Sequence, residues 1–246
     1  MADKERLDVL LVELGLCPTR ERARARILAG EVVVNDHRVD KPGTKVPRDA
    51  AIRLKGEALP YVSRGGLKLA HALEHFGIDV KDRVALDVGA STGGFTDVLL
   101  QRGAQRVYAV DVGWGQLAEP LRKDPRVVVM ERTHIKDLQP LAPAPDFCCI
   151  DVSFISLRLV LPHVARILAR PANVVALVKP QFEVGKGQVG KGGIVREAGL
   201  REQAVHDVRE AARALGFEDG GVVESPVTGQ KGNVEFLLSL RLPGGG

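Results

Sequence analysis

Aromatic residues and cysteines are both scarce in this sequence. Aromatic side chains make up only 4% of the 246 residues, so the core must be built mainly from Val, Leu, Ala and Ile. The three cysteines are Cys17, Cys148 and Cys149, and no two of them form a CxxC pair. This argues against a disulfide framework or a zinc site, and it favours a reducing compartment. Cys148 and Cys149 lie in an apolar run, so both are expected to be buried.

Long apolar segments are missing as well. No run approaches the roughly 18 apolar residues of a membrane-spanning helix, so no contact with a membrane is expected. Residues 1–8 are rich in charge and lack the apolar stretch of a secretory signal. Together these absences predict a cytoplasmic protein.

The first part of the chain has the pattern of a small α+β domain. Apolar residues recur at helical spacing, Thr19 is suited to cap the second helix, and short β-branched runs follow. The expected elements are helices at 7–14 and 20–29 and strands at 32–34, 38–39, 44–46 and 51–54, the last two paired with each other. Gly56 and Pro60 then mark a linker. We therefore expect a first domain over residues 1–59.

Residues 60–246 are expected to form a larger α/β domain. After a helix that Ser63 opens, at 66–76, apolar strands alternate with helices, which is typical of a parallel sheet covered on both faces. The expected strands are 84–88, 107–110, 127–130, 147–150 and 174–178, and the expected helices are 94–102, 117–123, 159–169 and 200–215. Runs at 222–224 and 235–240 predict a terminal antiparallel hairpin. This is a Rossmann-like arrangement.

A glycine-rich segment joins the first of these strands to a helix. It reads Asp87-Val88-Gly89-Ala90-Ser91-Thr92-Gly93-Gly94-Phe95. Its spacing departs from the GxGxxG of dinucleotide sites, and Asp87 would repel a pyrophosphate but suits the cationic groups of S-adenosylmethionine. Asp111 ends the next strand, where an acid typically binds ribose hydroxyls. A purely structural turn is the alternative. The predicted cofactor-binding residues are Asp87, Gly89, Ala90, Ser91, Thr92, Gly93, Gly94, Phe95, Asp111, Val112 and Asp151.

A second glycine-rich run does not predict a nucleotide site. Residues 185–191 spell GxxxxGK, but Gly192 stands where a P-loop needs Ser or Thr. The run is either a basic loop that contacts substrate or a plain solvated loop.

Four charged residues are candidates for catalysis. Asp151 and Lys179 follow apolar strands, at the edge of the sheet where ligands bind. Lys68 lies on the helix before the first strand, and Glu235 begins the last strand. Taken singly, Lys68 and Glu235 would usually be solvated surface groups, so Asp151 and Lys179 are the stronger candidates.

Several segments together resemble one family. The segments are 63–69, 87–95, 151–155, 179–183 and 232–236, and they are similar to the TlyA family, often labelled hemolysins, whose members methylate ribose 2′-hydroxyls of ribosomal RNA. The second domain resembles the FtsJ-like methyltransferases, whose Lys-Asp-Lys-Glu signature matches Lys68, Asp151, Lys179 and Glu235 in order. The first domain resembles the S4 RNA-binding module. The resemblance covers about residues 5–242.

This resemblance implies a reaction and a set of roles. The cofactor would be S-adenosylmethionine, the substrate ribosomal RNA or a ribosomal subunit, with cytidine as the target and no metal involved. Lys179 would accept the proton of the ribose hydroxyl, and Lys68 would position that hydroxyl or stabilise negative charge. Asp151 and Glu235 would orient the two amines. The oligomeric state is not predicted.

The net charge of +4 is a mild indication of an anionic partner. Arginines 20, 22, 24 and 26 cluster at the start of the second expected helix, and such a cluster suits phosphate contacts. A solvated helix face is the alternative, because several glutamates lie nearby. The resemblance to the S4 module favours RNA contact, and the predicted RNA-binding residues are Arg20, Arg22, Arg24 and Lys41.

Three other functions are considered. A methyltransferase for a small molecule or a protein would not need the first domain. A membrane-active hemolysin would need an amphipathic or spanning apolar segment, and the sequence offers neither. A binding-only RNA protein would not need the four charged residues.

Overall fold

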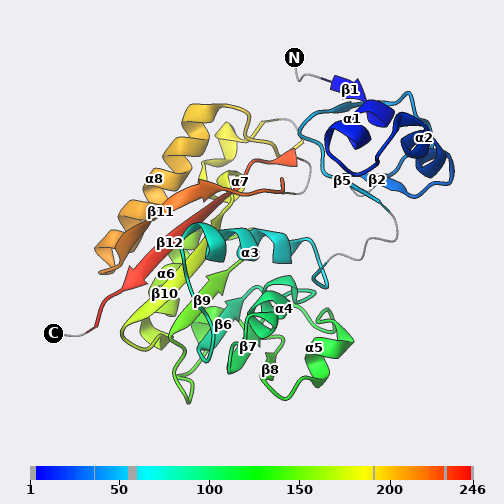
Figure 1. Cartoon of the computed structure of the whole chain (residues 1–246). Helices are drawn as coiled ribbons and strands as arrows, with labels where there is room; N and C mark the ends of the chain where they lie inside the picture. Colours follow the sequence, from blue (N-terminus) through cyan, green and yellow to red (C-terminus); the bar gives the residue numbers. More distant parts are fainter. Residues whose placement is uncertain (1–3, 36, 55–59, 191, 230–231, 245–246) are drawn as a thin grey trace. The chain divides into compact units, whose positions relative to one another are not determined.

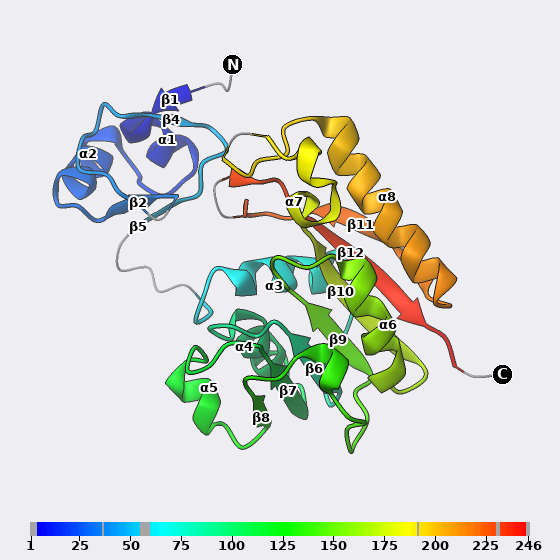
Figure 2. The same ribbon diagram turned by 180° about the vertical axis from the view of Figure 1, so that it is seen from behind.

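A computed structural model describes residues 4–35, 37–54, 60–190, 192–229 and 232–244 (Figures 1 and 2). The chain divides into two compact units, residues 1–59 and residues 60–246. Each unit has its own hydrophobic core, so each is described by itself.

The first unit packs two helices against short strands. The helices are α1 (Leu7–Glu13) and α2 (Arg20–Leu28), and the strands are β1 (Lys4–Arg6), β2 (Val32–Val34), β3 (His37–Arg38), β4 (Lys45–Pro47) and β5 (Ile52–Leu54). The hydroxyl of Thr19 accepts a hydrogen bond from the backbone N–H of Arg22 at 3.3 Å, so the predicted helix cap is confirmed. Leu7, Leu11 and Ile27 are fully buried between the helices and the strands.

Strand pairing in this unit differs from the prediction. The strands at 44–46 and 51–54 do not pair with each other: β4 pairs with β1 and β5 pairs with β2, both antiparallel. The error arose because β1 was not predicted. Its three residues, Lys4-Glu5-Arg6, are all charged and show no apolar alternation. The sequence Asn35-Asp36 also predicts a turn, and Asp36 lies outside the described residues.

The second unit is built on a mixed sheet that, in the described residues, has seven strands. Their order across the sheet is β11 (Glu218–Glu224), β12 (Phe236–Leu242), β10 (Ala172–Val178), β9 (Phe147–Ile150), β6 (Val84–Val88), β7 (Arg106–Val110) and β8 (Val127–Met130). Strands β6 to β10 are parallel, and β12 pairs antiparallel with both β10 and β11. The predicted Rossmann-like sheet with its terminal hairpin is confirmed. The chain reverses its direction of winding between β6 and β9, and open α/β sheets bind ligands at such a switch point.

Helices cover both faces of this sheet (Figures 1 and 2). The helices are α3 (Gly65–His75), α4 (Gly94–Gln101), α5 (Glu119–Lys123), α6 (Leu157–Ile167), α7 (Pro180–Glu183) and α8 (Ala198–Ala214), with 3-10 turns at Ile135–Asp137 and Lys186–Gln188. Along β6, Val84, Leu86 and Val88 face α6 and α8, whereas Ala85 faces α3 and α4. Cys148 and Cys149 point to opposite faces in the same way, and both are fully buried.

Some predicted boundaries shift by one or two residues. Helix α3 begins at Gly65 and its side-chain cap is absent: the backbone carbonyl of Ser63 accepts from Gly66 N–H at 3.1 Å, whereas the Ser63 side chain does not cap the helix. Glu235 lies just before β12, not within it. No helix in the described residues is long and apolar enough to cross a bilayer.

Candidate active site

The glycine-rich loop after β6 passes close to the end of β9. Gly89 has a φ of +86°, and a β-carbon there would overlap the carbonyl oxygen of Asp151. Gly93 has a φ of +97° and is the N-cap of α4. Both positions require glycine, because a side chain would meet a strained backbone and a filled space. The loop thus brings residues 89–94 next to Asp151 at the switch point of the sheet.

Two cavities open beside this loop and share part of their walls. One has a volume of about 490 Å³ and extends past Asp111, Thr133 and His134. The other has a volume of about 310 Å³ and extends toward α3 and the segment before β12. Their common wall is formed by Gly89, Ser91, Asp151, Ser153 and Phe154. A ligand that spans both cavities must therefore pass the ends of β6 and β9.

Asp111 is held rigidly at the wall of the larger cavity. One carboxylate oxygen accepts the N–H of Ser91 at 2.7 Å, and the other accepts the N–H of Gly113 at 2.7 Å. Each oxygen keeps a second lone pair for a ligand hydroxyl, which fits the predicted contact with a ribose. Val112 lines the same cavity and is largely exposed.

Asp87 lies beneath the loop rather than on a cavity wall. Its carboxylate is fully buried, accepts the Thr96 hydroxyl at 2.7 Å, and lines neither cavity. Burial raises the pKa of Asp87 to about 7, and the charge of Asp151 adds to the rise while the hydrogen bond from Thr96 opposes it. Its Oδ1 accepts no hydrogen bond from the described residues. Direct contact between Asp87 and the cofactor stays a prediction, whereas Asp111 and Asp151 reach the walls.

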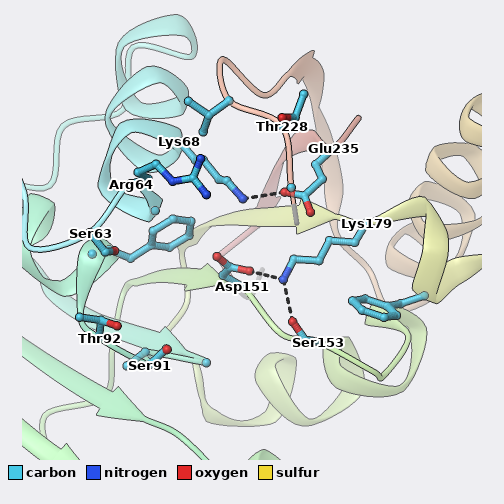
Figure 3. Close-up of a pocket in the computed structure, with 18 of the residues that line it drawn as sticks. Ser63, Arg64, Lys68, Ser91, Thr92, Asp151, Ser153, Lys179, Thr228 and Glu235 are labelled. Atoms are coloured by element: carbon cyan, nitrogen blue, oxygen red, sulfur yellow. Dashed lines mark hydrogen bonds and ion pairs between the residues drawn. The ribbon is translucent and has the colours of Figure 1, made fainter. Parts of the chain in front are cut away.

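The four charged candidates form two ion pairs on the wall of the smaller cavity (Figure 3). Lys68 Nζ lies 2.6 Å from Glu235 Oε2, and Lys179 Nζ lies 2.6 Å from Asp151 Oδ1. Lys179 also donates to the Ser153 hydroxyl at 3.0 Å. All but Asp151 are buried, and Asp151 is partly buried. The fold brings together residues up to 167 positions apart in the chain.

Other predicted cofactor residues are distributed over both walls. Ala90, Thr92, Gly94 and Phe95 line the smaller cavity, and Ser91 and Gly89 line both. Gly93 lines neither of the two large cavities, because it turns the chain into α4.

Sequence reasoning gave no role to several residues at the smaller cavity. Phe154 is 90% exposed, and its ring centroid lies 5.0 Å from that of Phe182. Its φ of +65° is unusual for an aromatic residue and stores backbone strain. Gln181 also lines the cavity, and its buried Oε1 accepts no hydrogen bond from the described residues. A positive φ leaves no mark in a single sequence, so Phe154 could not be found that way.

The predicted RNA-binding residues of the first unit differ in their surroundings. Arg22, Arg24 and Lys41 are exposed. Arg20 is exposed as well, but its guanidinium forms an ion pair with the buried carboxylate of Asp8 at 3.1 Å, and this carboxylate also binds Arg6. Their guanidinium groups hold the pKa of Asp8 below its usual value. Arg6, which the prediction did not include, therefore shares its ion-pair partner with Arg20.

Both units match the models of known domain families. A model of the FtsJ-like methyltransferase family matches residues 61–242, and an S4 domain model matches residues 5–52. The chain is 52% identical over 246 residues to a Bacillus subtilis protein provisionally named rRNA methyltransferase YqxC, covering 99% of this chain and 88% of that protein. It is 49% identical over 244 residues to the 16S/23S rRNA (cytidine-2′-O)-methyltransferase TlyA of Mycobacterium tuberculosis, covering 98% of this chain and 91% of that protein.

Solved structures match the chain over much of its length. A Streptococcus thermophilus protein provisionally named a hemolysin matches with a TM-score of 0.77 and 50% identity, over 99% of this chain and 90% of its own. An S-adenosylmethionine-dependent methyltransferase from Aquifex aeolicus, at 20% identity, shares the fold alone with a TM-score of 0.53, over 74% of this chain and 94% of its own. The resemblance to TlyA and to both domain families, predicted from sequence, is confirmed. The chain belongs to the FtsJ-like methyltransferase family and carries an S4 domain ahead of its methyltransferase domain.

Proposed function

We propose that this protein transfers the methyl group of S-adenosylmethionine to the ribose 2′-hydroxyl of cytidines in ribosomal RNA. The observation that carries the proposal is the pair of lysine–carboxylate ion pairs on one cavity wall, next to a glycine-rich loop and to Asp111, whose carboxylate is held by two backbone N–H groups. The 49% identity to an rRNA (cytidine-2′-O)-methyltransferase over nearly the whole chain supports the choice of substrate.

The two cavities fit the two reactants. The larger one has the carboxylate of Asp111 for ribose hydroxyls and the largely apolar wall that an adenine needs, with Thr133 and His134 at that end. The smaller one offers the unpaired Gln181 Oε1, and a buried acceptor without a donor is costly unless a ligand supplies one. When bound, S-adenosylmethionine supplies a methyl group activated by a positive sulfonium. In this proposal the residues of the shared wall, Asp151 among them, would hold the two reactants side by side.

Lys179 is placed to take the proton of the attacking hydroxyl. A ribose 2′-hydroxyl is a poor nucleophile until its proton is removed, and only the neutral amine form of a lysine can accept that proton. Lys179 would therefore release the proton that it carries in the ion pair before it takes one from the hydroxyl. Asp151 and Ser153 hold Lys179 Nζ from two sides, at 2.6 Å and 3.0 Å, which fixes where the amine points. Holding reacting groups in a productive geometry can supply about 7–11 kcal/mol of barrier lowering.

Lys68 and Glu235 are assigned to the ribose. The ammonium of Lys68 can donate to the target oxygen and stabilise the negative charge that develops there, while Glu235 keeps the long side chain in place at 2.6 Å. Because the pair joins α3 to the segment before β12, it also holds together the two sides of the smaller cavity.

Two exposed features suit the RNA itself. Phe154 and Phe182 lie at the smaller cavity, and an exposed aromatic ring there can stack on a base that has left its helix. Arg22, Arg24 and Lys41 in the S4 domain are exposed and suit phosphate contacts. In this proposal the S4 domain docks the RNA and the methyltransferase domain selects the nucleotide.

The test is a labelling experiment with a matched variant. Purified protein and Lys179→Ala are incubated with methyl-labelled S-adenosylmethionine and, in separate reactions, naked ribosomal RNA, small subunits, large subunits and whole ribosomes from a strain that lacks the enzyme. The RNA is digested and the labelled nucleoside is identified. We expect 2′-O-methylcytidine, and we expect the Lys179 variant to lose at least about a hundredfold in rate while still binding S-adenosylhomocysteine.

Two results would overturn the proposal. No label in any RNA, with intact cofactor binding, would move the substrate to a small molecule or a protein. Leakage of liposomes caused by the purified protein would support the membrane-active function suggested by the hemolysin names of some relatives.

A further inference from the structure

Glu183 is a buried carboxylate just outside the active site. It ends α7, the single helical turn that begins directly after Lys179, and it is only 5% exposed. Its side chain lines neither cavity, so it is not placed to touch either reactant. Burial raises the pKa of Glu183, which means that the charged form is costly to keep there. Because Glu183 does not face the reactants, we looked for a role of this buried carboxylate in the parts of the chain that it binds.

The carboxylate binds the start of α6, on the segment that follows β9. One oxygen accepts the Leu157 N–H at 2.8 Å, and the other accepts the Ser156 hydroxyl at 2.5 Å. Arg158 completes the arrangement, because its guanidinium lies 3.7 Å from the carboxylate and donates to the Glu183 backbone carbonyl at 3.1 Å. Glu183 therefore ties the segment after β10 to the segment after β9.

These are the two segments that carry one half of the candidate catalytic machinery. The segment after β9 holds Asp151, Ser153 and Phe154, and the segment after β10 holds Lys179 and Phe182. Between them run the Lys179–Asp151 ion pair, the Lys179–Ser153 hydrogen bond and the contact of the two phenylalanine rings. The residues of these contacts line the cavities, whereas Glu183 lines neither of the two and makes its contacts away from them.

We infer that Glu183 is a positioning residue, which fixes the register between Lys179 and the Asp151–Phe154 segment and so keeps the amine and the aromatic rings aligned for methyl transfer. This inference rests on the proposed function. It assigns Glu183 no contact with substrate or cofactor.

The strained backbone at Phe154 is a second reason for such an anchor. A positive φ in an aromatic residue persists only where the surroundings hold the chain on both sides. On one side the segment is held by β9, and on the other by Ser156 and Leu157, both bound to Glu183. Without the carboxylate, Phe154 is free to relax to negative φ and carry its ring away from Phe182.

Two variants of Glu183 and one matched control test the inference. Glu183→Ala removes the anchor, whereas Glu183→Gln keeps an oxygen for Leu157 N–H and an amide that can bind Ser156. The control, Asp219→Ala, removes another partly buried carboxylate, which binds Arg209 and the N–H of Gly221 and lines no cavity. Each full-length protein is measured for its melting temperature, for kcat and KM with ribosomal RNA and with cofactor, and for hydrogen exchange by mass spectrometry.

We expect Glu183→Ala to lower kcat about 10- to 100-fold, because misplacing a reacting group by about 1 Å has effects of this size. The KM for the cofactor should change less than about threefold, since Asp111 still fixes its other end. Glu183→Gln should recover most of the loss. Asp219→Ala should lower the melting temperature by a similar amount and leave kcat within about twofold.

The exchange measurement separates failure of the inference from failure of the proposed function. Peptides covering 152–158 and 180–184 should exchange faster in Glu183→Ala and unchanged in Asp219→Ala, whatever the substrate is. Unchanged exchange in these peptides, or a kcat that falls equally in Glu183→Ala and Asp219→Ala, would overturn the positioning role. If the unmodified protein methylates no RNA, the proposed function fails and the exchange result still decides the role of Glu183.

Discussion

The same residue types are used differently in the two units of the chain. Several ion pairs in the described part of the S4 domain are exposed, such as Arg26–Glu31 at 3.8 Å and Arg48–Glu13 at 2.7 Å. Around the smaller cavity, Lys68–Glu235 and Lys179–Asp151 are largely withdrawn from water. Exposed charged side chains stay hydrated, so they lose little solvation free energy and can contact a polyanion. Buried charged side chains need a partner of opposite charge, which fixes their positions, and catalysis requires reacting groups in fixed positions.

The largest effect that separates the two regions concerns stability. Glu235→Gln leaves the ammonium of Lys68 buried beside a neutral partner, and we expect the free energy of unfolding of the methyltransferase domain to fall by about 3 kcal/mol. Arg26→Gln breaks an exposed pair and should cost less than about 1 kcal/mol. Chemical denaturation of both variants measures the difference, and equal losses would remove the distinction between the two kinds of pair.

A second effect of burial appears as a dependence of stability on pH. Asp87 has a pKa of about 7 in the folded protein and 3.8 as its ordinary value, so the unfolded chain releases this proton first. The stabilising contribution of the protonated form is full below pH 3.8 and is lost as pH rises through 7. Each unit of difference between the folded and unfolded pKa values corresponds to about 1.4 kcal/mol of unfolding free energy. The free energy of unfolding should therefore fall by a few kcal/mol as the pH rises from 3.8 to 7.

Asp87→Asn isolates this contribution. Subtracting the unfolding free energy of the variant from that of the parent protein cancels the other titrating groups. The difference should fall between pH 4 and pH 7 and stay level above that range. A difference that does not vary with pH would show that Asp87 ionises normally in the fold.

Substitutions of Phe154 test whether its exposed ring at the smaller cavity contributes to RNA binding. Phe154→Ala should reduce methylation of RNA about tenfold, because stacking on a base is worth roughly 1–3 kcal/mol. Phe154→Gly should lose as much activity yet be more stable than Phe154→Ala by about 1 kcal/mol, since glycine relieves the positive φ. Retained activity in both would show that the ring contributes nothing to substrate binding.

The smallest effects are expected in the S4 domain. Arg22→Ala and Arg24→Ala each remove one exposed cation, so each should weaken RNA binding a few-fold and reduce the slope of log K against log salt by about 1. Turnover at saturating RNA should not change. Binding titrations at several salt concentrations measure the slope, and an unchanged slope would indicate that these side chains face solvent in the complex.

How far the sequence could be interpreted also differs between the units. In the methyltransferase domain, continuous apolar strands and glycines at a strand end made the sheet and its ligand edge predictable. Asp151 and Lys179 were predicted from their places at the ends of apolar strands. Lys68 and Glu235 gained support only from the family resemblance, since no local pattern marks either residue. In the S4 domain the three charged residues of β1 concealed a strand, and the pairing of β4 was wrong as a result. Short edge strands depend on partners distant in the chain, which no local pattern reveals.

Contacts that depend on three-dimensional surroundings were also beyond the sequence. The burial of Asp87, the positive φ of Phe154 and the anchoring by Glu183 all arise from how neighbouring segments pack. Glu183 lies in a segment that contributed to the family resemblance. Its residue type and its spacing do not reveal whether its carboxylate binds a ligand or the first residues of a neighbouring helix.

The pairing of Lys68 with Glu235 has a consequence for the order in which the protein is made. Synthesis delivers the lysine early and its carboxylate 167 residues later. During translation the strands β6 to β10 are already complete while the smaller cavity lacks one wall and Lys68 lacks its counter-charge. A chain interrupted before Glu235 can therefore carry the glycine-rich loop and Asp111 without an assembled centre for the reaction.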